Sequence, residues 1–416
     1  MAFRDQDGAN SLGDHPFSSI SAPTNSSRYQ DYTNYFPVNR PCNTTVPRAA
    51  GDCSSGGNVV SINKWEPLTT PQFKNGSGTP ATKGFIVPHM CNVRPFALQF
   101  ASQFRPQGPP IFGKATDSSR RTFEEQHLEV LRYSSTLGDR EKLISQFWLP
   151  TPDLANPPNI FYRFTMNALV TKEANLEDSV KLLFLVSNSA FDAGIATWDA
   201  KRIYDSARPF TAVRCLKAGV QVEAWAGYYQ GVQSIDGGAW MPYQDFTSVS
   251  PPHGEYVSGH STFSSAAATA LKLFFDSDTF VGPNSITFEE GDSFFEAKIT
   301  DTSNPAYRAG FTDVPNSGFN SVGYVPARAV TLQWDTWSAA AVEAGMSRLY
   351  GGIHIQDSNL DGQLLGRRVS EVVFEKAKSL FDGKQDTNND YSSNGCSSVS
   401  LFYILSSVLF AFVLLL

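Results

Sequence analysis

The sequence predicts a mostly α-helical protein, built as a helical bundle with long irregular loops. Apolar residues recur at helical intervals over about 159–172, 176–199, 260–275, 328–347 and 359–380. Strand-like alternation is nearly absent, and no internal repeat occurs. With 416 residues, of which 41% are hydrophobic, the chain is long enough to bury a large core.

The chain divides by composition into four regions. Residues 1–62 are rich in Ser, Asn, Pro and Gly, and we expect extended loops there. Residues 63–381 are expected to form the helical domain. Its first part is irregular, and its first helix begins at a capping-box-like sequence, Thr122–Glu125. A polar spacer, 382–398, and a hydrophobic segment, 399–416, follow.

The C-terminal segment predicts an association with a membrane. Its 18 residues carry no charge, which suits either a spanning anchor or a cleaved GPI signal. A buried helix is the third possibility, but the segment has no polar face. Residues 1–7 hold no secretory signal, so we expect either a tail anchor or a start that has been truncated. The body of the protein is then expected outside the cell or in a lumen.

Charge and cysteine content limit the possible partners. The net charge of −7 and the lack of a Lys/Arg run argue against nucleic-acid binding. Among five cysteines, Cys42 and Cys53 are close enough in sequence to form a disulfide, and no spacing typical of a zinc site occurs. Asn-x-Ser/Thr triplets at Asn25, Asn43 and Asn75 would permit glycosylation.

A junction between a loop and a helix carries the first candidate site. Pro251, Pro252 and Gly254 predict a turn, and an apolar, Ala-rich helix follows residue 260. Ser258 and Gly259 therefore fall at a helix N-terminus, where a hydroxyl and a backbone N–H can hold an anion. His260 beside them can transfer protons near neutral pH. An ordinary helix cap with a hydrogen-bonded histidine is the alternative.

Two further clusters carry positive charge. Lys201 and Arg208 are seven residues apart, so we predict that they share one helix face, with Pro209 ending the helix. Two neighbouring cations repel each other unless an anion lies between them. Arg348 follows an amphipathic helix, and His354 comes after a glycine turn. Taken singly, these clusters also fit a solvated basic edge and a buried structural histidine.

Together the clusters form an ordered pattern: Lys-x6-Arg-Pro, Ser-Gly-His and Ser-Arg-x5-His. The pattern resembles that of the vanadium-dependent haloperoxidases and the related type-2 phosphatidic-acid phosphatases. The similarity covers about residues 63–380 and includes FDAGIATWDAK (191–201), EYVSGHSTFSSAAA (255–268) and EAGMSRLYGGIH (343–354). It implies a helical-bundle core of the haloperoxidase and acid-phosphatase type.

The resemblance also implies a cofactor and a role for each site residue. The residues that would hold the oxygens of vanadate are Lys201, Arg208, Ser258, Gly259 and Arg348. His354 would supply the nitrogen ligand to vanadium, and His260 would be the acid–base group. No haem is expected. The implied partners are hydrogen peroxide, a halide ion and a small organic acceptor of the halogen.

Two other functions stay open on the same residues. One is a phosphatase in which His354 attacks phosphorus, and the other is a membrane-tethered homologue without turnover. Between His260 and Ser347 lie 86 residues, a long gap that favours the haloperoxidase branch. Val257 stands where both families usually have Pro. Ser358 stands where the phosphatase pattern has Asp.

The halide preference is expected to depend on two residues near the cage. His253 lies seven residues before His260, at a position that resembles the histidine of algal bromoperoxidases. Trp198 instead resembles the chloroperoxidase pocket. We therefore predict oxidation of bromide and iodide, with weak or no chloride activity. The alternative is that His253 is only a turn residue between Pro252 and Gly254.

Overall fold

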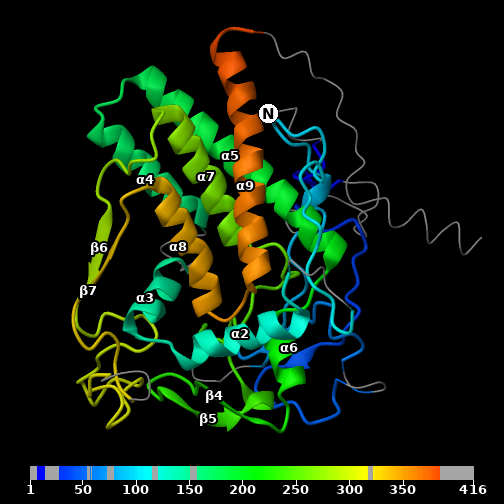
Figure 1. Ribbon diagram of the computed structural model, residues 1–416, viewed down its shortest axis with the longest axis vertical. Coiled ribbons are helices and arrows are strands. Elements are labelled where there is room, and N and C mark those ends of the chain that lie inside the picture. The colour runs from blue at the N-terminus through cyan, green and yellow to red at the C-terminus, as the bar shows by residue number, and fades with distance from the viewer. Residues whose placement is uncertain are drawn as a thin grey trace, which may run out of the picture.

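Helix α7 (Gly259–Phe275) lies at the centre of a helical bundle, as the computed structural model shows (Figure 1). It packs against α4 (Pro157–Thr171), α5 (Leu176–Tyr204), α8 (Trp337–Tyr350) and α9 (Gln356–Phe381). The mostly α-helical class is thus confirmed, as are helices close to 159–172, 176–199, 260–275 and 359–380. The structure describes residues 7–14, 28–53, 57, 59–72, 79–114, 120–149, 157–316 and 322–384.

Small residues let α7 and α9 approach closely. A Cβ at Gly366 on α9 would lie 2.2 Å from the carbonyl oxygen of Thr262 on α7, so a side chain there has no room. A Cβ at Gly362 would lie 2.9 Å from the carbonyl oxygen of Ser258. Alanines 266–268 and 270 of α7 are buried in the same core. This close packing fixes the start of α7 against α9.

Hydrogen-bonded caps define where three helices begin. The Thr122 hydroxyl accepts from the Glu125 N–H, and the Glu125 carboxylate accepts from the Thr122 N–H, which confirms the predicted capping box of α2 (Phe123–Ser135). The side chain of Asn175 accepts from the Asp178 N–H and so caps α5. The Ser258 hydroxyl accepts from the Ser261 N–H and caps α7.

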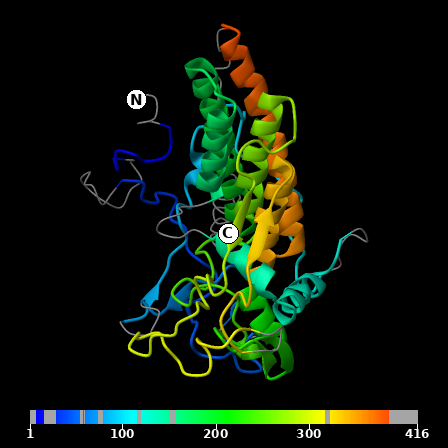
Figure 2. The ribbon, with the colours of Figure 1, turned by 90° about the vertical axis from the view of Figure 1, so that its left-hand side faces the viewer.

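Shorter elements surround the lower end of the bundle and its flank (Figure 2). They are β1 (Cys42–Asn43), β2 (Leu68–Thr70), β3 (Ala81–Thr82), the 3-10 helices η1 (Met90–Asn92) and η2 (Gly237–Ala239), α3 (Asp139–Phe147), α6 (Pro209–Leu216), β4 (Gln221–Trp225), β5 (Val232–Asp236), β6 (Ser285–Phe288) and β7 (Val330–Gln333). Strands β1 and β2 pair in parallel, and β2–β3, β4–β5 and β6–β7 are antiparallel.

The predicted helix over 328–347 is wrong in its first half. Residues Val330–Gln333 form strand β7, which pairs with β6, and Leu332 on it is buried. Apolar residues at every second position carry the strand period, which the neighbouring alanine-rich sequence obscured. The helix α8 starts only after Thr336, whose hydroxyl accepts from the Ala339 N–H.

The prediction that Lys201 and Arg208 share one helix face is also wrong. Helix α5 ends at Tyr204, because Asp205 adopts a left-handed conformation with φ 47°. Arg208 is the N-cap of α6, and Pro209 occupies the first turn of that helix instead of ending the previous one. The chain reverses between the two cations, so their proximity depends on this turn.

The suggested Cys42–Cys53 disulfide is wrong. Cys53 pairs with Cys215, which links the N-terminal region to α6, and Cys42 is a free, half-buried thiol. The predicted spacer and hydrophobic tail, from residue 385 onward, lie outside the described residues, as do Asn25 and Asn75. Within the described part of the chain, α5 alone has the length and hydropathy of a membrane span. Because 61% of its most apolar window is buried, it is a core helix of this bundle.

Candidate functional site: a buried cationic cage

Four helix ends meet in the lower half of the bundle (Figure 1). Lys201 lies near the end of α5 and Arg348 near the end of α8, while α7 begins after Ser258 and α9 begins just after His354. We call the buried group Lys201, Arg208, Ser258, Arg348 and His354 the cage, and each of its members is at most 2% exposed. The N-termini of α7 and α9 both favour negative charge near them.

His354 is held by a carboxylate that the pattern did not include. Its Nδ1 lies 2.5 Å from Oε1 of Glu255 and 3.2 Å from the Ser358 hydroxyl. A carboxylate beside Nδ1 accepts a hydrogen bond from Nδ1–H. This contact fixes the tautomer and leaves a lone pair on Nε2. The other ring nitrogen, Nε2, lies 3.0 Å from Nη1 of Arg208, which can only donate. His354 therefore carries an electron pair on Nε2, which accepts from Arg208 here and can serve as a metal ligand or a nucleophile once that hydrogen bond is exchanged.

Arg208 joins three parts of the site. Its Nη1 donates to the carbonyl of Ile353 at 2.8 Å, beside the contact with His354. Its Nη2 lies 2.9 Å from Nδ1 of His253, and its Nε donates to the carbonyl of the same residue at 3.1 Å. The guanidinium is thus fixed in place by the two loops that precede α7 and α9.

Lys201 fixes the loop that leads into α7. Its ammonium donates to the carbonyls of Gly254 and Glu255 at 3.0 Å each and to that of Val257 at 2.5 Å. These three bonds use all three of its N–H groups. Lys201 therefore contributes positive charge and loop order. A direct bond to a bound anion would require the exchange of one carbonyl.

Arg348 has donors that the protein leaves unused. Its Nη1 lies 2.7 Å from Nε2 of His260 and 3.4 Å from the carbonyl of Trp148. Its Nε and Nη2 are buried and have no hydrogen-bond partner among the residues that the structure describes. A buried charged donor without a partner costs about 1–3 kcal/mol or more, so native proteins rarely contain one unless a ligand completes it. This edge of the guanidinium is suited to an oxyanion.

Ser258 and Gly259 lie where the predicted anion cradle requires them. The Ser258 hydroxyl accepts from the Ser261 N–H, which leaves its own O–H to donate. Gly259 is the first residue of α7, and the first N–H groups of a helix have no partner within the helix. A Cβ at Gly259 would meet the Phe263 ring at 3.7 Å.

His260 has a partner for each of its protonation states. Its Nε2 lies 2.7 Å from Nη1 of Arg348, a donor, and 2.7 Å from the carbonyl oxygen of Trp148, an acceptor. Neutral His260 accepts from Arg348, and protonated His260 donates to Trp148. Burial, and then the charge of Arg348, hold the pKa of His260 well below its usual value. The imidazole is therefore a neutral base at pH 7.

His253 and Trp198 lie side by side next to the cage. Their ring centroids are 5.2 Å apart. Nδ1 of His253 lies 2.9 Å from Nη2 of Arg208, a donor, and 3.1 Å from the carbonyl oxygen of Gly254, an acceptor. The Trp198 indole donates to the carbonyl of Ile86 at 3.0 Å, which fixes its ring against His253. Thus His253 is more than a turn residue: it contacts a cage arginine directly.

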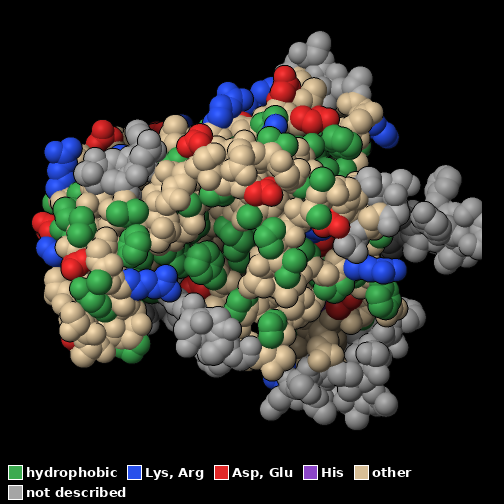
Figure 3. All heavy atoms as spheres, turned by 90° about the horizontal axis from the view of Figure 1, so that it is seen from below, with side chains coloured by type: hydrophobic (Ala, Val, Ile, Leu, Met, Phe, Trp, Pro, Cys, Tyr) green, Lys and Arg blue, Asp and Glu red, His purple; other side chains and the backbone are tan. Residues whose placement is uncertain are grey.

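The electrostatics of the cage favour a bound anion. Burial lowers the pKa of Arg208 to about 10, and burial together with the charge of Arg208 lowers that of Arg348 to about 9. Burial also lowers the pKa of Lys201 and raises that of Glu255 to about 7. Three buried cations thus face one carboxylate. The histidines of the site do not reach the described part of the face seen from below, on which no histidine is visible (Figure 3). An anion among these groups would offset their mutual repulsion.

Sequence reasoning missed two residues of the site. Glu255 lies in the stretch 255–268 but outside the three short motifs, and the phosphatase pattern instead has an acidic residue at position 358. Trp148 contributes only a backbone carbonyl, which leaves no signal in a side-chain pattern. A charged residue five positions before His260, in the turn that leads into the predicted helix, was the available signal for Glu255.

Replacing Glu255 tests how His354 is positioned. We expect Glu255→Gln to weaken about 10- to 100-fold the binding of an oxyanion that takes Nε2 as a ligand, because an amide is a poorer acceptor for Nδ1–H and lowers the basicity of Nε2. Ser358→Ala, which removes only the longer contact to Nδ1, should have a smaller effect. Equilibrium dialysis with orthovanadate measures both. If Glu255→Gln binds vanadate more tightly, the net charge of the cage matters more than the orientation of His354.

Comparison with known proteins places this geometry in a family. Residues 181–383 match the family described as "VCPO second helical-bundle domain". No curated protein sequence matches the chain. Among solved structures, the chain is similar to an apo-type bacterial vanadium-dependent chloroperoxidase, with 20% identity, a TM-score of 0.68 and coverage of 91% of this chain and 72% of the other.

The holo-type structure of a bacterial vanadium-dependent chloroperoxidase gives 19% identity, a TM-score of 0.66 and coverage of 91% and 70%. At this identity the likeness concerns the fold. The family match includes α7, α8 and α9 entirely and nearly all of α5, the helices whose ends form the cage. Residues 181–383 therefore match this family, and the fold of the chain is that of the vanadium-dependent haloperoxidases.

Proposed function

We propose that the protein binds vanadate in the cage and uses hydrogen peroxide to oxidise a halide ion to hypohalous acid. The observation that carries this proposal is that the cage contains both kinds of group. Arg348 has two buried nitrogens, Nε and Nη2, whose N–H groups are unused, and neutral His354 has a lone pair on Nε2. A tetrahedral oxyanion whose central atom accepts a nitrogen ligand satisfies both. Vanadate has these two properties.

The cage residues fit vanadate without further partners. Arg348 would hold oxygens through Nε and Nη2, and Ser258 and Gly259 would donate from the start of α7. His354 would be the nitrogen ligand, supported by Glu255. Bound vanadium(V) supplies the Lewis acidity that activates hydrogen peroxide toward halide, without a haem and without a change of oxidation state.

The chain itself supplies proton transfer and charge. His260, neutral at pH 7, removes a proton from incoming hydrogen peroxide, and its protonated form is then stabilised by the carbonyl of Trp148. The positive charges of Lys201, Arg208 and Arg348 stabilise the anionic oxygens as charge develops on them. Because the whole cage is buried, these interactions act in a medium of low dielectric constant, where they are stronger than in water.

A phosphatase is the second candidate, because the same cage and the same His354 nucleophile suit a phosphomonoester. Two assays on one preparation separate the functions: oxidation of bromide by hydrogen peroxide, with and without orthovanadate, and hydrolysis of p-nitrophenyl phosphate. We expect oxidation that depends on vanadate. Hydrolysis without any vanadate-dependent oxidation would overturn the proposal in favour of the phosphatase. If neither reaction occurs although vanadate binds, the chain is an inactive homologue.

The halide preference is proposed to depend on His253. We expect oxidation of bromide and iodide with little chloride activity, because chloride is the hardest of the three to oxidise. The two similar structures are those of chloroperoxidases, so chloride oxidation is the competing outcome. Replacing His253 by Phe removes the contact of Nδ1 with Arg208 and should change the chloride-to-bromide ratio of kcat/KM. Efficient chlorination of monochlorodimedone that is unchanged in His253→Phe would show that this position does not set the preference.

We further propose that the uncharged segment 399–416 holds the protein at a membrane, with the cage outside the cell or in a lumen. Deleting 399–416 should release the protein into the soluble fraction with its halide oxidation intact. Release of the full chain by phospholipase C would identify a GPI anchor, whereas retention would identify a spanning tail. A full-length product that fractionates with cytosolic proteins would contradict the proposed location.

A further inference from the structure

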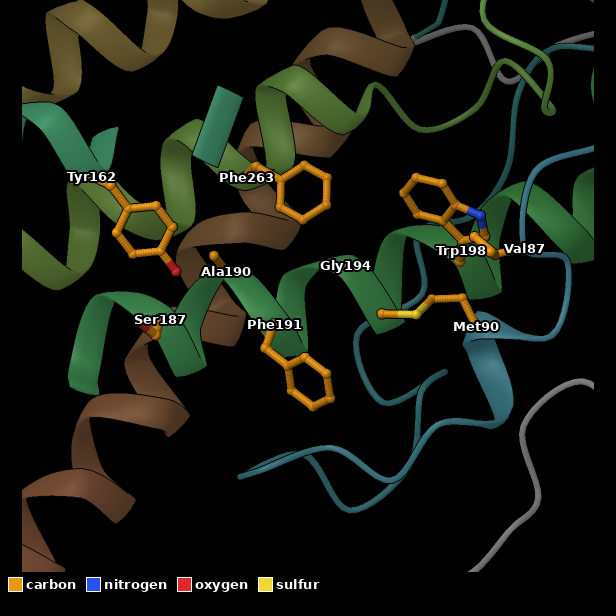
Figure 4. Close-up of a pocket in the computed structure, with 9 residues that line it drawn as sticks. All are labelled: Val87, Met90, Tyr162, Ser187, Ala190, Phe191, Gly194, Trp198 and Phe263. Carbon is orange, nitrogen blue, oxygen red and sulfur yellow. The ribbon is translucent and has the colours of Figure 1, made fainter. Parts of the chain in front are cut away.

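An apolar cavity of about 390 Å³ lies along α5, outside the cage (Figure 4). Its walls include the side chains of Met90, Tyr162, Phe191, Trp198 and Phe263, and Gly194 lies between them on the helix. Its volume lies within the range of about 300–1,000 Å³ that is usual for small-molecule sites. The mechanism proposed above uses none of these side chains except Trp198.

The lining indicates a neutral, flat ligand. Among the described residues that line the cavity, four are aromatic and none is charged. Aromatic walls favour stacked or edge-on contacts with a ring, whereas a charged ligand would lose its hydration without compensation. The hydroxyl of Tyr162 points toward α5 beside Ala190 (Figure 4), so it can orient one polar substituent of the ligand.

Aromatic side chains connect the cavity with the cage. Trp198 lines the cavity, and its ring lies 5.2 Å from that of His253, which contacts Arg208 through Nδ1 at 2.9 Å. Phe263 lines the cavity one turn beyond Gly259 on α7, and its ring lies 6.4 Å from that of Trp198. Two side chains, Trp198 and His253, therefore connect a molecule in the cavity with Arg208 of the cage.

We propose that this cavity binds the organic acceptor of the halogen, a neutral, electron-rich aromatic compound of one or two rings. The proposal rests on the proposed halide oxidation. A ring carbon donates an electron pair to the halogen of hypohalous acid, the carbon–halogen bond forms, and the halogen–oxygen bond breaks. The ring then loses the proton of that carbon, which combines with the hydroxide to give water. One arene and one hypohalous acid thus give one halogenated arene and one water.

Gly194 offers a direct way to fill the cavity. A Cβ at this position would lie 3.1 Å from a ring carbon of Phe263 and 3.7 Å from the terminal carbon of Met90, so a larger side chain must extend into the cavity. Glycine is an unfavourable helix residue, and its replacement by Leu favours the helix itself. The matched control is Gly84→Leu, because a Cβ at Gly84 meets nothing within 4 Å.

The test measures 1-naphthol binding to the vanadate-free protein by isothermal titration calorimetry. We expect saturable binding to the wild type and to Gly84→Leu, and binding that is about 10- to 100-fold weaker in Gly194→Leu. If Gly194→Leu fails to fold, Ser187→Phe fills the same cavity from a half-buried lining position. Wild-type affinity in a folded filling variant would overturn the proposal, as would an absence of binding to the wild type.

Product analysis provides the second readout. With bromide, hydrogen peroxide and vanadate, the wild type should give a ratio of 2-bromo- to 4-bromo-1-naphthol that differs from that of free hypobromite. Gly194→Leu should give the ratio of the free reagent. If the wild-type ratio equals that of free hypobromite, the cavity does not hold the acceptor, although halide oxidation stands. If 1-naphthol binds in the cavity but no bromide is oxidised, the proposed function fails and the acceptor role fails with it.

Discussion

His354→Ala should lose vanadate binding and halide oxidation together. The substitution removes the only nitrogen lone pair that Glu255 and Arg208 hold in position in the cage. The cations that remain would still attract an oxyanion, but without the nitrogen ligand the vanadium would dissociate on dialysis. We expect no measurable bromide oxidation after removal of free vanadate. Elemental analysis of the dialysed protein gives the vanadium content.

A second buried histidine provides the control for this variant. His127 on α2 is 2% exposed, and its Nδ1 lies 2.7 Å from the carbonyl of Phe123, outside the cage. His127→Ala should retain vanadium even if it lowers the free energy of unfolding. If His354→Ala retains the wild-type amount of vanadium, His354 is not the ligand.

His260→Ala should separate binding from turnover. Arg348, Ser258 and His354 remain in this variant, so vanadate should stay bound. Without the acid–base group, kcat for bromide oxidation should fall by about 10²- to 10⁴-fold. Measuring kcat and vanadium content on the same preparation distinguishes this result from a general loss of structure.

The pH dependence of His260→Ala supplies the decisive comparison. A side chain that accepts a proton gives the wild-type rate a pH dependence that the variant lacks. His260→Gln preserves much of the volume but cannot take up a proton, so it should resemble His260→Ala. Full activity of either variant at every pH would show that another group performs the proton transfer.

Much of the bundle could be predicted because its helices carry strong local signals. The capping box at Thr122 and the apolar run after Ser258 predicted where α2 and α7 begin, and the structure confirms both starts. Strand β7 was missed because its alternating pattern is only four residues long. The longer alanine-rich sequence of α8 follows it closely and favours a helix over the whole stretch. The turn at Asp205 was missed as well, because a left-handed aspartate at a helix end has no distinctive sequence signal.

The cage could be predicted only as an ordered pattern of residue types. The pair Lys201 and Arg208 is far in the sequence from the pair Arg348 and His354, and no single spacing brings the two pairs together. The roles of Glu255 and Trp148 arise from tertiary contacts across more than 90 residues, which local periodicity does not encode. The sequence thus predicted the charges of the site, while the orientation of its histidines required the structure.

The central claim is that one vanadate completes the cage and makes the chain an oxidising enzyme. The most direct test titrates vanadate-free protein with orthovanadate and measures bound vanadium and the rate of bromide oxidation by hydrogen peroxide in parallel. We predict that both rise together, reach a plateau at one vanadate per chain, and fall together when phosphate competes for the site. Saturable binding with no rise in rate, or a rate that does not depend on bound vanadate, would contradict the claim.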